Sequence, residues 1–141
     1  RATAENVSTQ CFDANLLPRR PAEVTKNFKL LGAQSFDASS TKPSNMSIAQ
    51  GLHSYGDEAA VVSKLPGHKT VLHAGLTEAM VRFAARYEYA RTVEDMLARR
   101  WRTLFLDAKL AASLTEPVAQ ILQEETGQDQ QLAAFMDLAK Q

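Results

Sequence analysis

Residues 76–112 contain neither proline nor glycine, and this long uninterrupted run restricts the fold more than any other feature of the sequence. Most residues in it are good helix formers. Apolar residues recur in steps of three and four, in two series: Leu76, Met80, Phe83, Ala84 and Tyr87, then Val93, Met96, Leu97, Trp101, Leu104, Phe105 and Ala108. Such spacing places each series on one side of an α-helix. The run therefore predicts helices that pack against others, with Trp101 and Phe105 in the centre of the core.

The junction between the two series admits two interpretations. One is a single helix that runs on unbroken. The other is a bend at Arg91–Thr92, in which Thr92 caps a new helix and Asp95 is its third residue. Because the apolar stripe is interrupted between Tyr87 and Val93, its phase favours the bend. The first helix is then expected from about Glu78 to Tyr89, with Thr77 as its N-cap.

Upstream of this run, two short helices are expected. Ser44 or Asn45 caps the first, which ends at Gly56 and carries an apolar face of Ile48, Leu52 and Tyr55. Asp57 caps the second, which runs to Leu65 and turns Ala60, Val61 and Leu65 inward. Pro66-Gly67 stops it, and residues 66–75 are expected to form a connecting loop.

Downstream, two helices are expected to pair as a hairpin around Gly127. Thr115-Glu-Pro117 opens the first of them, since proline is tolerated in a first turn, and Gly127 closes it. The acidic pair Glu124-Glu125 is expected on a solvated face. Asp129 is expected to cap the last helix, whose inward residues are Leu132, Phe135, Met136, Leu138 and Ala139.

These elements predict an all-α fold, a small bundle of about five to seven helices with an irregular N-terminal linker. Pro18 and Pro21 make a continuous helix unlikely in the linker, although a short helix over Ala2–Ser8 is compatible with the sequence. The expected organisation is a linker or tail of a preceding domain over residues 1–43 and a helical domain over residues 44–141.

Composition excludes several classes of protein. Lys plus Arg and Asp plus Glu each number 16, so the formal net charge is zero, which argues against nucleic acid as a partner. Cys11 is the single cysteine, which fits a reducing compartment, and a cytoplasmic location is expected. No apolar run of about 18 residues predicts a membrane span, and no signal peptide opens the chain.

No catalytic or ligand-binding motif is present. The sequence lacks the GxGxxG, P-loop, GxSxG and HExxH patterns. His68 and His73 do not have the i,i+4 spacing of a helical metal pair, and no cluster of cysteines or carboxylates completes a site. We therefore expect no catalytic, cofactor-binding or metal-binding residue in this chain.

An arginine-rich segment is the candidate for interaction. Its residues are Arg91, Asp95, Arg99, Arg100 and Arg102, with Glu88 and Glu94 nearby. One interpretation is an ion-pair network that fixes two helices, with i,i+4 pairs at Glu78–Arg82, Arg91–Asp95 and Asp95–Arg99. The other is that one or two arginines contact phosphate or a neighbouring domain, because the planar guanidinium group can form two parallel bonds with a carboxylate or a phosphate.

This segment carries a family resemblance. Residues 88–100 (EYARTVEDMLARR), Arg102 and Phe105-Leu-Asp107 resemble the signature of the C-terminal helical domain of FAD-dependent glycerol-3-phosphate dehydrogenases and of the related α-glycerophosphate oxidases. Tyr55-Gly56 and Thr77-Glu78 extend the resemblance, which covers roughly residues 44–140.

The resemblance implies that the chain is a non-catalytic fragment of a larger enzyme. That parent oxidises sn-glycerol 3-phosphate to dihydroxyacetone phosphate, with electrons passing to FAD and then to quinone or oxygen. FAD belongs to the parent's preceding domain, which is the expected partner and the domain that one or two arginines of the segment would contact; a homo-oligomer is a further option, and the parent is expected to be cytoplasmic or peripheral to the membrane. The alternative from the residues alone is a stand-alone helical module that binds an acidic partner or nucleic acid through Arg99–Arg102, which the zero net charge disfavours. A membrane-surface helix fits less well, because the apolar faces are needed for the core.

Overall fold

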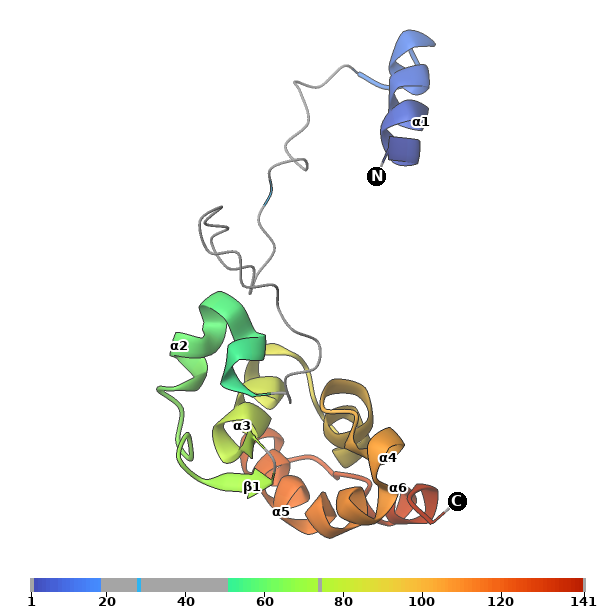
Figure 1. Cartoon of the computed structure of the whole chain (residues 1–141). Helices are drawn as coiled ribbons and strands as arrows, with labels where there is room; N and C mark the ends of the chain where they lie inside the picture. The colour runs from blue at the N-terminus through green and yellow to red at the C-terminus, as the bar shows by residue number, and fades with distance from the viewer. Residues whose placement is uncertain (1, 19–27, 29–50, 74, 141) are drawn as a thin grey trace. The chain divides into compact units, whose positions relative to one another are not determined.

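The computed structural model describes residues 2–18, 28, 51–73 and 75–140, in two compact units, residues 1–30 and 31–141. Unit 1 contains helix α1 (Ala2–Asp13), which is longer than the expected Ala2–Ser8. The elements of unit 2 are, in order, η1 (Leu52–Glu58), α2 (Ala59–Val62), β1 (Val71–His73), β2 (Leu76–Thr77), α3 (Glu78–Tyr87), η2 (Asp95–Arg100), α4 (Thr103–Leu106), α5 (Ala108–Thr126) and α6 (Leu132–Leu138) (Figure 1). The fold is mostly helical and small, which confirms the predicted class.

The expected helix start at Ser44 or Asn45, its apolar residue Ile48 and most of the linker lie outside the described residues. The division of the chain at residues 43 and 44 stays a prediction. Residues 66–75 were expected to form a loop, but β1 lies within them and pairs antiparallel with β2, which follows directly, with Val71 opposite Thr77.

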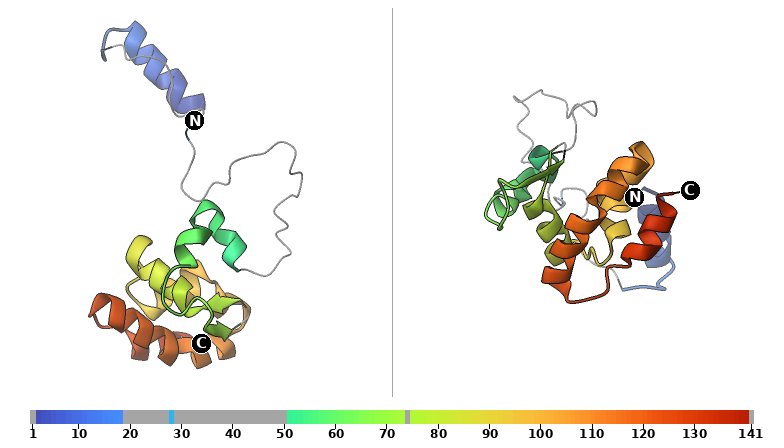
Figure 2. Two further views of the ribbon diagram at one scale, coloured as in Figure 1. Left: turned by 90° about the vertical axis from the view of Figure 1, so that its left-hand side faces the viewer. Right: turned by 90° about the horizontal axis from the view of Figure 1, so that it is seen from below.

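The core of unit 2 forms around α3 and α5, which lie side by side (Figures 1 and 2). Helix α3 buries nearly a full face because its apolar residues follow the helical period. Met80 and Phe83 from α3 and Val118 and Leu122 from α5 are almost completely buried. Burying side chains of this size contributes about 1.5–3 kcal/mol each, so this contact accounts for much of the stability of the unit.

The long proline- and glycine-free run is divided into several helices. Helix α3 ends at Tyr87, and Tyr89 adopts a left-handed conformation with φ 59°. The π-helix η2 follows, and a second left-handed residue, Arg102, separates it from α4. The bend interpretation at Arg91–Thr92 is therefore confirmed.

The prediction that Phe105 lies in the core is wrong, and for Trp101 it is correct only in part. Phe105 is 70% exposed, whereas Trp101 is partly buried at the edge of the core. The prediction assumed one helix through both residues. Because the helix breaks at Arg102, the i,i+4 relation between Trp101 and Phe105 is lost and the second ring turns outward.

The prediction that Thr115-Glu-Pro117 opens a helix is also wrong. Helix α5 begins at Ala108, where the carboxylate of Asp107 accepts from the backbone N–H of Leu110 at 3.0 Å, and Pro117 lies inside it. A single apolar stripe from Ala111 to Leu122 keeps the helix continuous through the proline. Gly127 closes α5 with φ 64°, as expected, because glycine adopts this conformation without strain.

Two shorter helices differ from expectation in which residues they bury. Helix α2 ends at Val62, short of the predicted end at Leu65. Leu65 is buried as predicted, but Ala60 and Val61 are exposed and Val62 is buried instead. Gly56 has φ 53° and interrupts the helix as predicted. In α6 only Phe135 is buried, Met136 and Ala139 are half-buried, and Leu132 and Leu138 are exposed. Gln131, not Asp129, is the N-cap of α6; Asp129 accepts from the backbone N–H of Gln131.

Candidate functional site

Arg100 joins separate parts of the arginine-rich segment. Its Nη1 donates to the backbone carbonyl of Asp95 at 2.9 Å, and its Nη2 donates to the backbone carbonyl of Glu88. Its Nε lies 3.4 Å from the Glu88 carboxylate. Because the guanidinium group presents donors in a fixed planar fork, Arg100 holds the turn after α3 against the end of η2.

Tyr55 reaches the same place from η1. Its ring packs edge-on against Phe83, with centroids 5.2 Å apart and planes at 84°. Burial raises the pKa of Tyr55, the nearby Glu88 carboxylate raises it further, and the Arg100 charge opposes both effects. Tyr55 is therefore a neutral phenol at physiological pH. We call the group Tyr55, Glu88 and Arg100 the signature junction, because all three residues belong to the segments that carry the family resemblance.

Asp95 and Thr92 form the predicted capping arrangement at the start of the next helical segment. The Asp95 carboxylate accepts from the backbone N–H groups of Arg91 (3.0 Å) and Thr92 (3.1 Å), and Thr92 Oγ1 accepts from the backbone N–H of Asp95 (3.2 Å). Burial opposes ionisation, but these hydrogen bonds and the Arg99 charge together lower the pKa of Asp95. The Asp95 carboxylate is therefore bound by local backbone N–H groups and by Arg99.

The remaining arginines of the segment differ in how they are engaged. Arg99 donates to Asp95 at 2.7 Å and to Glu94 at 2.8 Å, which confirms the predicted Asp95–Arg99 pair. Arg91 lies over the Tyr89 ring at 4.4 Å. The predicted ion pair between the Arg91 and Asp95 side chains does not form. Arg102 is exposed and makes no ion pair with any described residue. The structure therefore supports an ion-pair network for Arg99 and Arg100, whereas Arg91 is partly buried over the Tyr89 ring and Arg102 is exposed.

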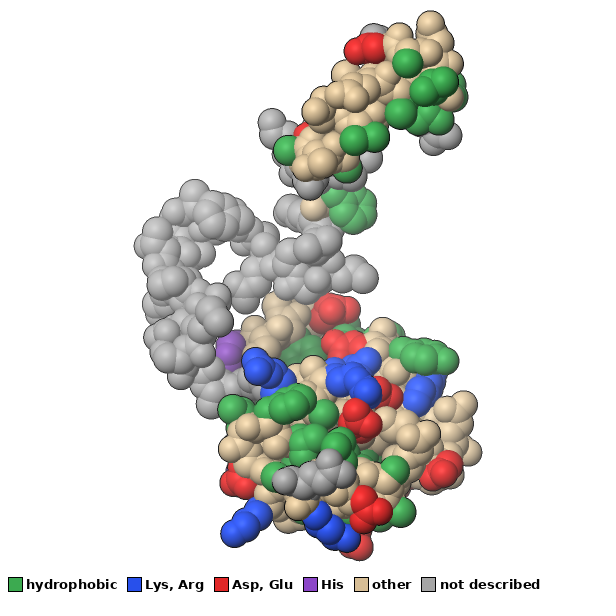
Figure 3. Space-filling model, turned by 90° about the vertical axis from the view of Figure 1, so that its right-hand side faces the viewer, with side chains coloured by type: hydrophobic (Ala, Val, Ile, Leu, Met, Phe, Trp, Pro, Cys, Tyr) green, Lys and Arg blue, Asp and Glu red, His purple; other side chains and the backbone are tan. Residues whose placement is uncertain are grey.

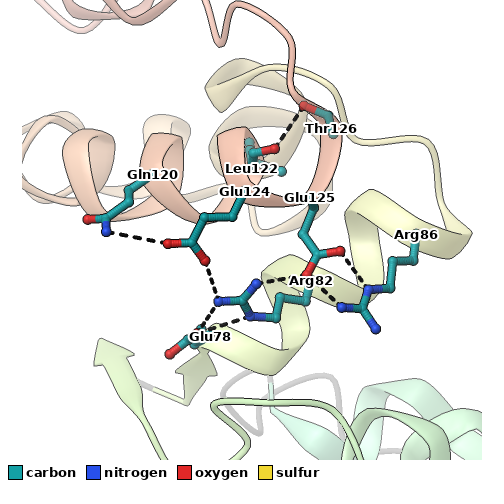
Figure 4. Close-up of polar contacts among 8 residues, drawn as sticks. All are labelled: Glu78, Arg82, Arg86, Gln120, Leu122, Glu124, Glu125 and Thr126. Carbon is teal, nitrogen blue, oxygen red and sulfur yellow. Dashed lines mark hydrogen bonds and ion pairs between the residues drawn. The ribbon is translucent and has the colours of Figure 1, made fainter.

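A second cluster, between α3 and α5, was not predicted. Arg82 donates to Glu78, to Glu124 (2.7 Å) and to Glu125 (2.8 Å), and Arg86 donates to both oxygens of Glu125 (Figure 4). The Arg82 and Glu125 side chains are only 13% and 9% exposed. The Glu78–Arg82 pair is confirmed. The prediction of a solvated Glu124-Glu125 face is correct for Glu124, whose side chain is 48% exposed, and wrong for Glu125. The two neighbouring carboxylates share Arg82.

Ion pairs between arginines of α3 and glutamates of α5 form this second cluster. Hydrogen bonds from Arg86 lower the pKa of Glu125, burial opposes the effect, and Arg82 adds to it. One signal of the cluster was present in the sequence. Carboxylates in the last turn of a helix face the negative end of its dipole, so an acidic pair there needs cations from elsewhere. Arg82 and Arg86, at i,i+4 on α3, supply them.

The chemistry available to these clusters is ionic and structural. Arg82, Arg86, Arg99 and Arg100 are each held by carboxylates or backbone carbonyls. Within residues 2–18, 28, 51–73 and 75–140, no group of three His, Cys, Asp or Glu side chains could hold a metal ion. In the same part of the chain, no helix is both long and apolar enough to cross a bilayer.

Comparison with known proteins assigns the chain to a family. Residues 23–133 match the family described as the C-terminal domain of alpha-glycerophosphate oxidase, and the chain belongs to that family. Its relatives include a mitochondrial glycerol-3-phosphate dehydrogenase of Schizosaccharomyces pombe, 40% identical over 65 residues, which cover 43% of this chain and 10% of that protein. A probable mitochondrial glycerol-3-phosphate dehydrogenase of Dictyostelium discoideum is 38% identical over 96 residues, which cover 60% of this chain and 15% of that protein.

A third relative aligns with more of the chain. The mitochondrial glycerol-3-phosphate dehydrogenase SDP6 of Arabidopsis thaliana is 28% identical over 151 residues, covering 89% of this chain and 24% of that protein. The chain thus spans between a tenth and a quarter of the length of these three relatives. No solved structure matches it significantly.

Proposed function

We propose that this chain is the C-terminal accessory domain of a glycerol-3-phosphate dehydrogenase that uses FAD. The parent enzyme oxidises sn-glycerol 3-phosphate to dihydroxyacetone phosphate, and its electrons pass from FAD to quinone. The observation that supports this most is that the residues resembling the family signature fold into one junction. Tyr55, Glu88 and Arg100 converge from segments that are separate in the sequence.

The role of the domain within the parent is structural. Arg82, Arg86, Arg99 and Arg100 are already engaged by protein oxygens, which supports a scaffold role over a flavin site. We therefore assign FAD to the part of the parent outside this chain and derive no catalytic step here. The engagement of Arg99 and Arg100 also favours a scaffold over a module that binds nucleic acid through Arg99–Arg102, because only Arg102 of these arginines lacks such a contact with a described residue.

Expression of the full-length parent tests the proposal. The purified full-length protein is expected to show flavin absorbance and to reduce an artificial electron acceptor when sn-glycerol 3-phosphate is added. The chain of residues 1–141 alone, purified in parallel, is expected to be colourless and inactive. A full-length protein without flavin, or a coloured and active fragment, would contradict the proposal.

The acceptor and the location need separate measurements. Oxygen consumption against quinone reduction by the full-length protein distinguishes an oxidase from a dehydrogenase. The cytoplasmic location, with or without peripheral attachment to the membrane, stays a prediction. The relatives are named mitochondrial, so cell fractionation should compare cytosol, mitochondria and membranes.

A further inference from the structure

Helix α4 turns two of its three large apolar side chains, Phe105 and Leu106, outward. Its inner side is already used, because Thr103 is buried and Leu104 packs against the core. Phe105 is 70% exposed and Leu106 is 81% exposed. Single exposed apolar residues are normal on a protein surface. Two adjacent ones on a helix with a packed inner side form a small apolar knob. Figure 3 shows that hydrophobic side chains are exposed among charged ones on one face of this unit.

The backbone before α4 creates this exposure. Arg102 has φ 59°, a left-handed conformation that costs about 1–2 kcal/mol in a residue other than glycine or asparagine. Had the helix continued from η2, Phe105 would have followed the buried stripe of Met96 and Leu97. The chain thus adopts an unfavourable local conformation whose result is to expose a phenylalanine and a leucine.

The rim of the knob is basic. Arg102 and Lys109 are both exposed, and neither forms an ion pair with a described residue. The nearby Asp107 carboxylate is used locally, where it accepts from the backbone N–H of Leu110 at 3.0 Å. We define the α4 patch as Arg102, Phe105, Leu106 and Lys109. Its complement is an apolar pocket rimmed by carboxylates, because rim charges of opposite sign select and orient a partner.

We propose that the α4 patch docks this domain onto the flavin-binding part of the same polypeptide; this inference rests on the proposed function. The relatives are four to ten times as long as the part that matches them, so most of such a parent lies outside this chain. A tethered partner needs little buried area, because the linkage raises its effective concentration.

The size of the patch favours this occupant over a second copy of the chain. Phe105 and Leu106 together offer at most roughly 300 Å² of apolar surface. A stable dimer between free molecules buries about 800 Å² on each partner. The knob is therefore suited to anchor a contact within one polypeptide, where the rest of the interface is polar, as is typical between domains.

Photo-crosslinking in the full-length protein tests the proposal. Phe105 is replaced by the photoreactive amino acid p-benzoylphenylalanine, and a matched protein carries it at Val71, which is 63% exposed on β1. After irradiation, peptide mass spectrometry identifies what position 105 has captured. The expected product is an intrachain crosslink to the flavin-binding part, formed from position 105 and not from position 71.

Every other outcome overturns the inference. A crosslink between two polypeptides would make the patch a contact between copies, and adducts with added phospholipid vesicles would make it a membrane contact. Equal intrachain crosslinking from positions 105 and 71, or none from position 105, would show that the patch has no specific occupant.

A pair of substitutions gives a second measurement. In the full-length protein, Phe105→Ser with Leu106→Ser should raise the rate of protease cleavage between the two parts about tenfold, because docking no longer suppresses opening. Val71→Ser should leave the rate unchanged, and circular dichroism should show that both variants stay folded. An unchanged rate in the folded double variant would overturn the inference.

Both measurements are independent of turnover. An intrachain crosslink in a protein without glycerol-3-phosphate activity would support docking and contradict the proposed function. An active enzyme without the crosslink would support the proposed function and contradict docking through the α4 patch.

Discussion

At the scale of single residues, Thr77 and Thr92 show that a favourable residue at an N-cap position does not by itself make a cap. Both occupy the position before a helix. Thr92 Oγ1 accepts from the backbone N–H of Asp95, while the Thr77 side chain makes no capping hydrogen bond. Thr77 is also the last residue of β2, where it pairs with Val71.

This difference predicts unequal effects of the same substitution. Thr92→Ala should lower the free energy of unfolding by about 1 kcal/mol, because the capping bond is lost. Thr77→Ala serves as the matched control and should change it by less than about 0.5 kcal/mol. Urea unfolding of both variants measures the two values. Equal losses would show that the hydroxyl of Thr92 has no capping role.

Two phenylalanines provide a second test at this scale. Phe83 is 1% exposed and contacts Tyr55 and Tyr87, whereas Phe105 is 70% exposed. In the chain of residues 1–141, Phe83→Ala should lower the free energy of unfolding by about 3–5 kcal/mol. Phe105→Ala should lower it by less than about 1 kcal/mol. A large loss for Phe105→Ala would restore the original assignment of that ring to the core.

At the scale of elements, the contact between α3 and α5 combines an apolar core with a charged edge. Arg82 and Glu125 are largely removed from water, so removing one charge leaves the other buried without its full set of partners. Glu124 also binds Arg82, but its side chain is 48% exposed and water can replace the contact.

The two neighbouring carboxylates should therefore respond differently. Glu125→Gln should lower the free energy of unfolding by about 2–3 kcal/mol, since it weakens hydrogen bonds from both Arg82 and Arg86. Glu124→Gln is the control and should cost less than about 1 kcal/mol. Thermal or urea unfolding decides between them. Similar costs would mean that the cluster is screened by solvent throughout.

Pro117 tests the continuity of α5. Inside a helix, proline removes one backbone hydrogen bond and crowds the preceding turn. Pro117→Ala should therefore raise the free energy of unfolding by about 1 kcal/mol or more, although greater freedom of the unfolded chain reduces the gain. If Pro117 instead lay in a first helical turn, the same substitution would be neutral or destabilising, and calorimetry would show no rise in Tm.

At the scale of the whole molecule, the ionic clusters predict loss of stability in acid. The folded structure lowers the pKa of Asp95 below 3.8 and that of Glu125 below 4.5. A carboxylate with a lowered pKa adds stability that is complete above its unfolded pKa and is lost as the pH falls through its folded value. The free energy of unfolding should thus decline as the pH falls below about 4.5. Urea titrations along this pH range measure the slope.

A double variant serves as the control for this pH dependence. Asp95→Asn with Glu125→Gln removes both titrating groups, so the variant should be less stable at neutral pH and its stability should decline less steeply in acid. An unchanged slope would assign the acid sensitivity to other carboxylates.

The sequence by itself determined the features that depend on nearby residues. The helical class, the break between α3 and η2, the Thr92–Asp95 cap and the closure of α5 at Gly127 all follow from apolar spacing and from hydrogen bonds within a few positions. Residues 88–100 of the sequence also carry the resemblance to the family that the chain belongs to.

Only the tertiary structure decided which surfaces meet. Arg82 and Glu125 are 43 positions apart, and their ion pair exists because α5 lies beside α3. The outward turn of Phe105 depends on the left-handed backbone at Arg102, which helix propensity does not predict. Periodicity describes one helix at a time. The packing of several helices determines where each helix breaks, which of its faces is buried and which charges lose contact with water.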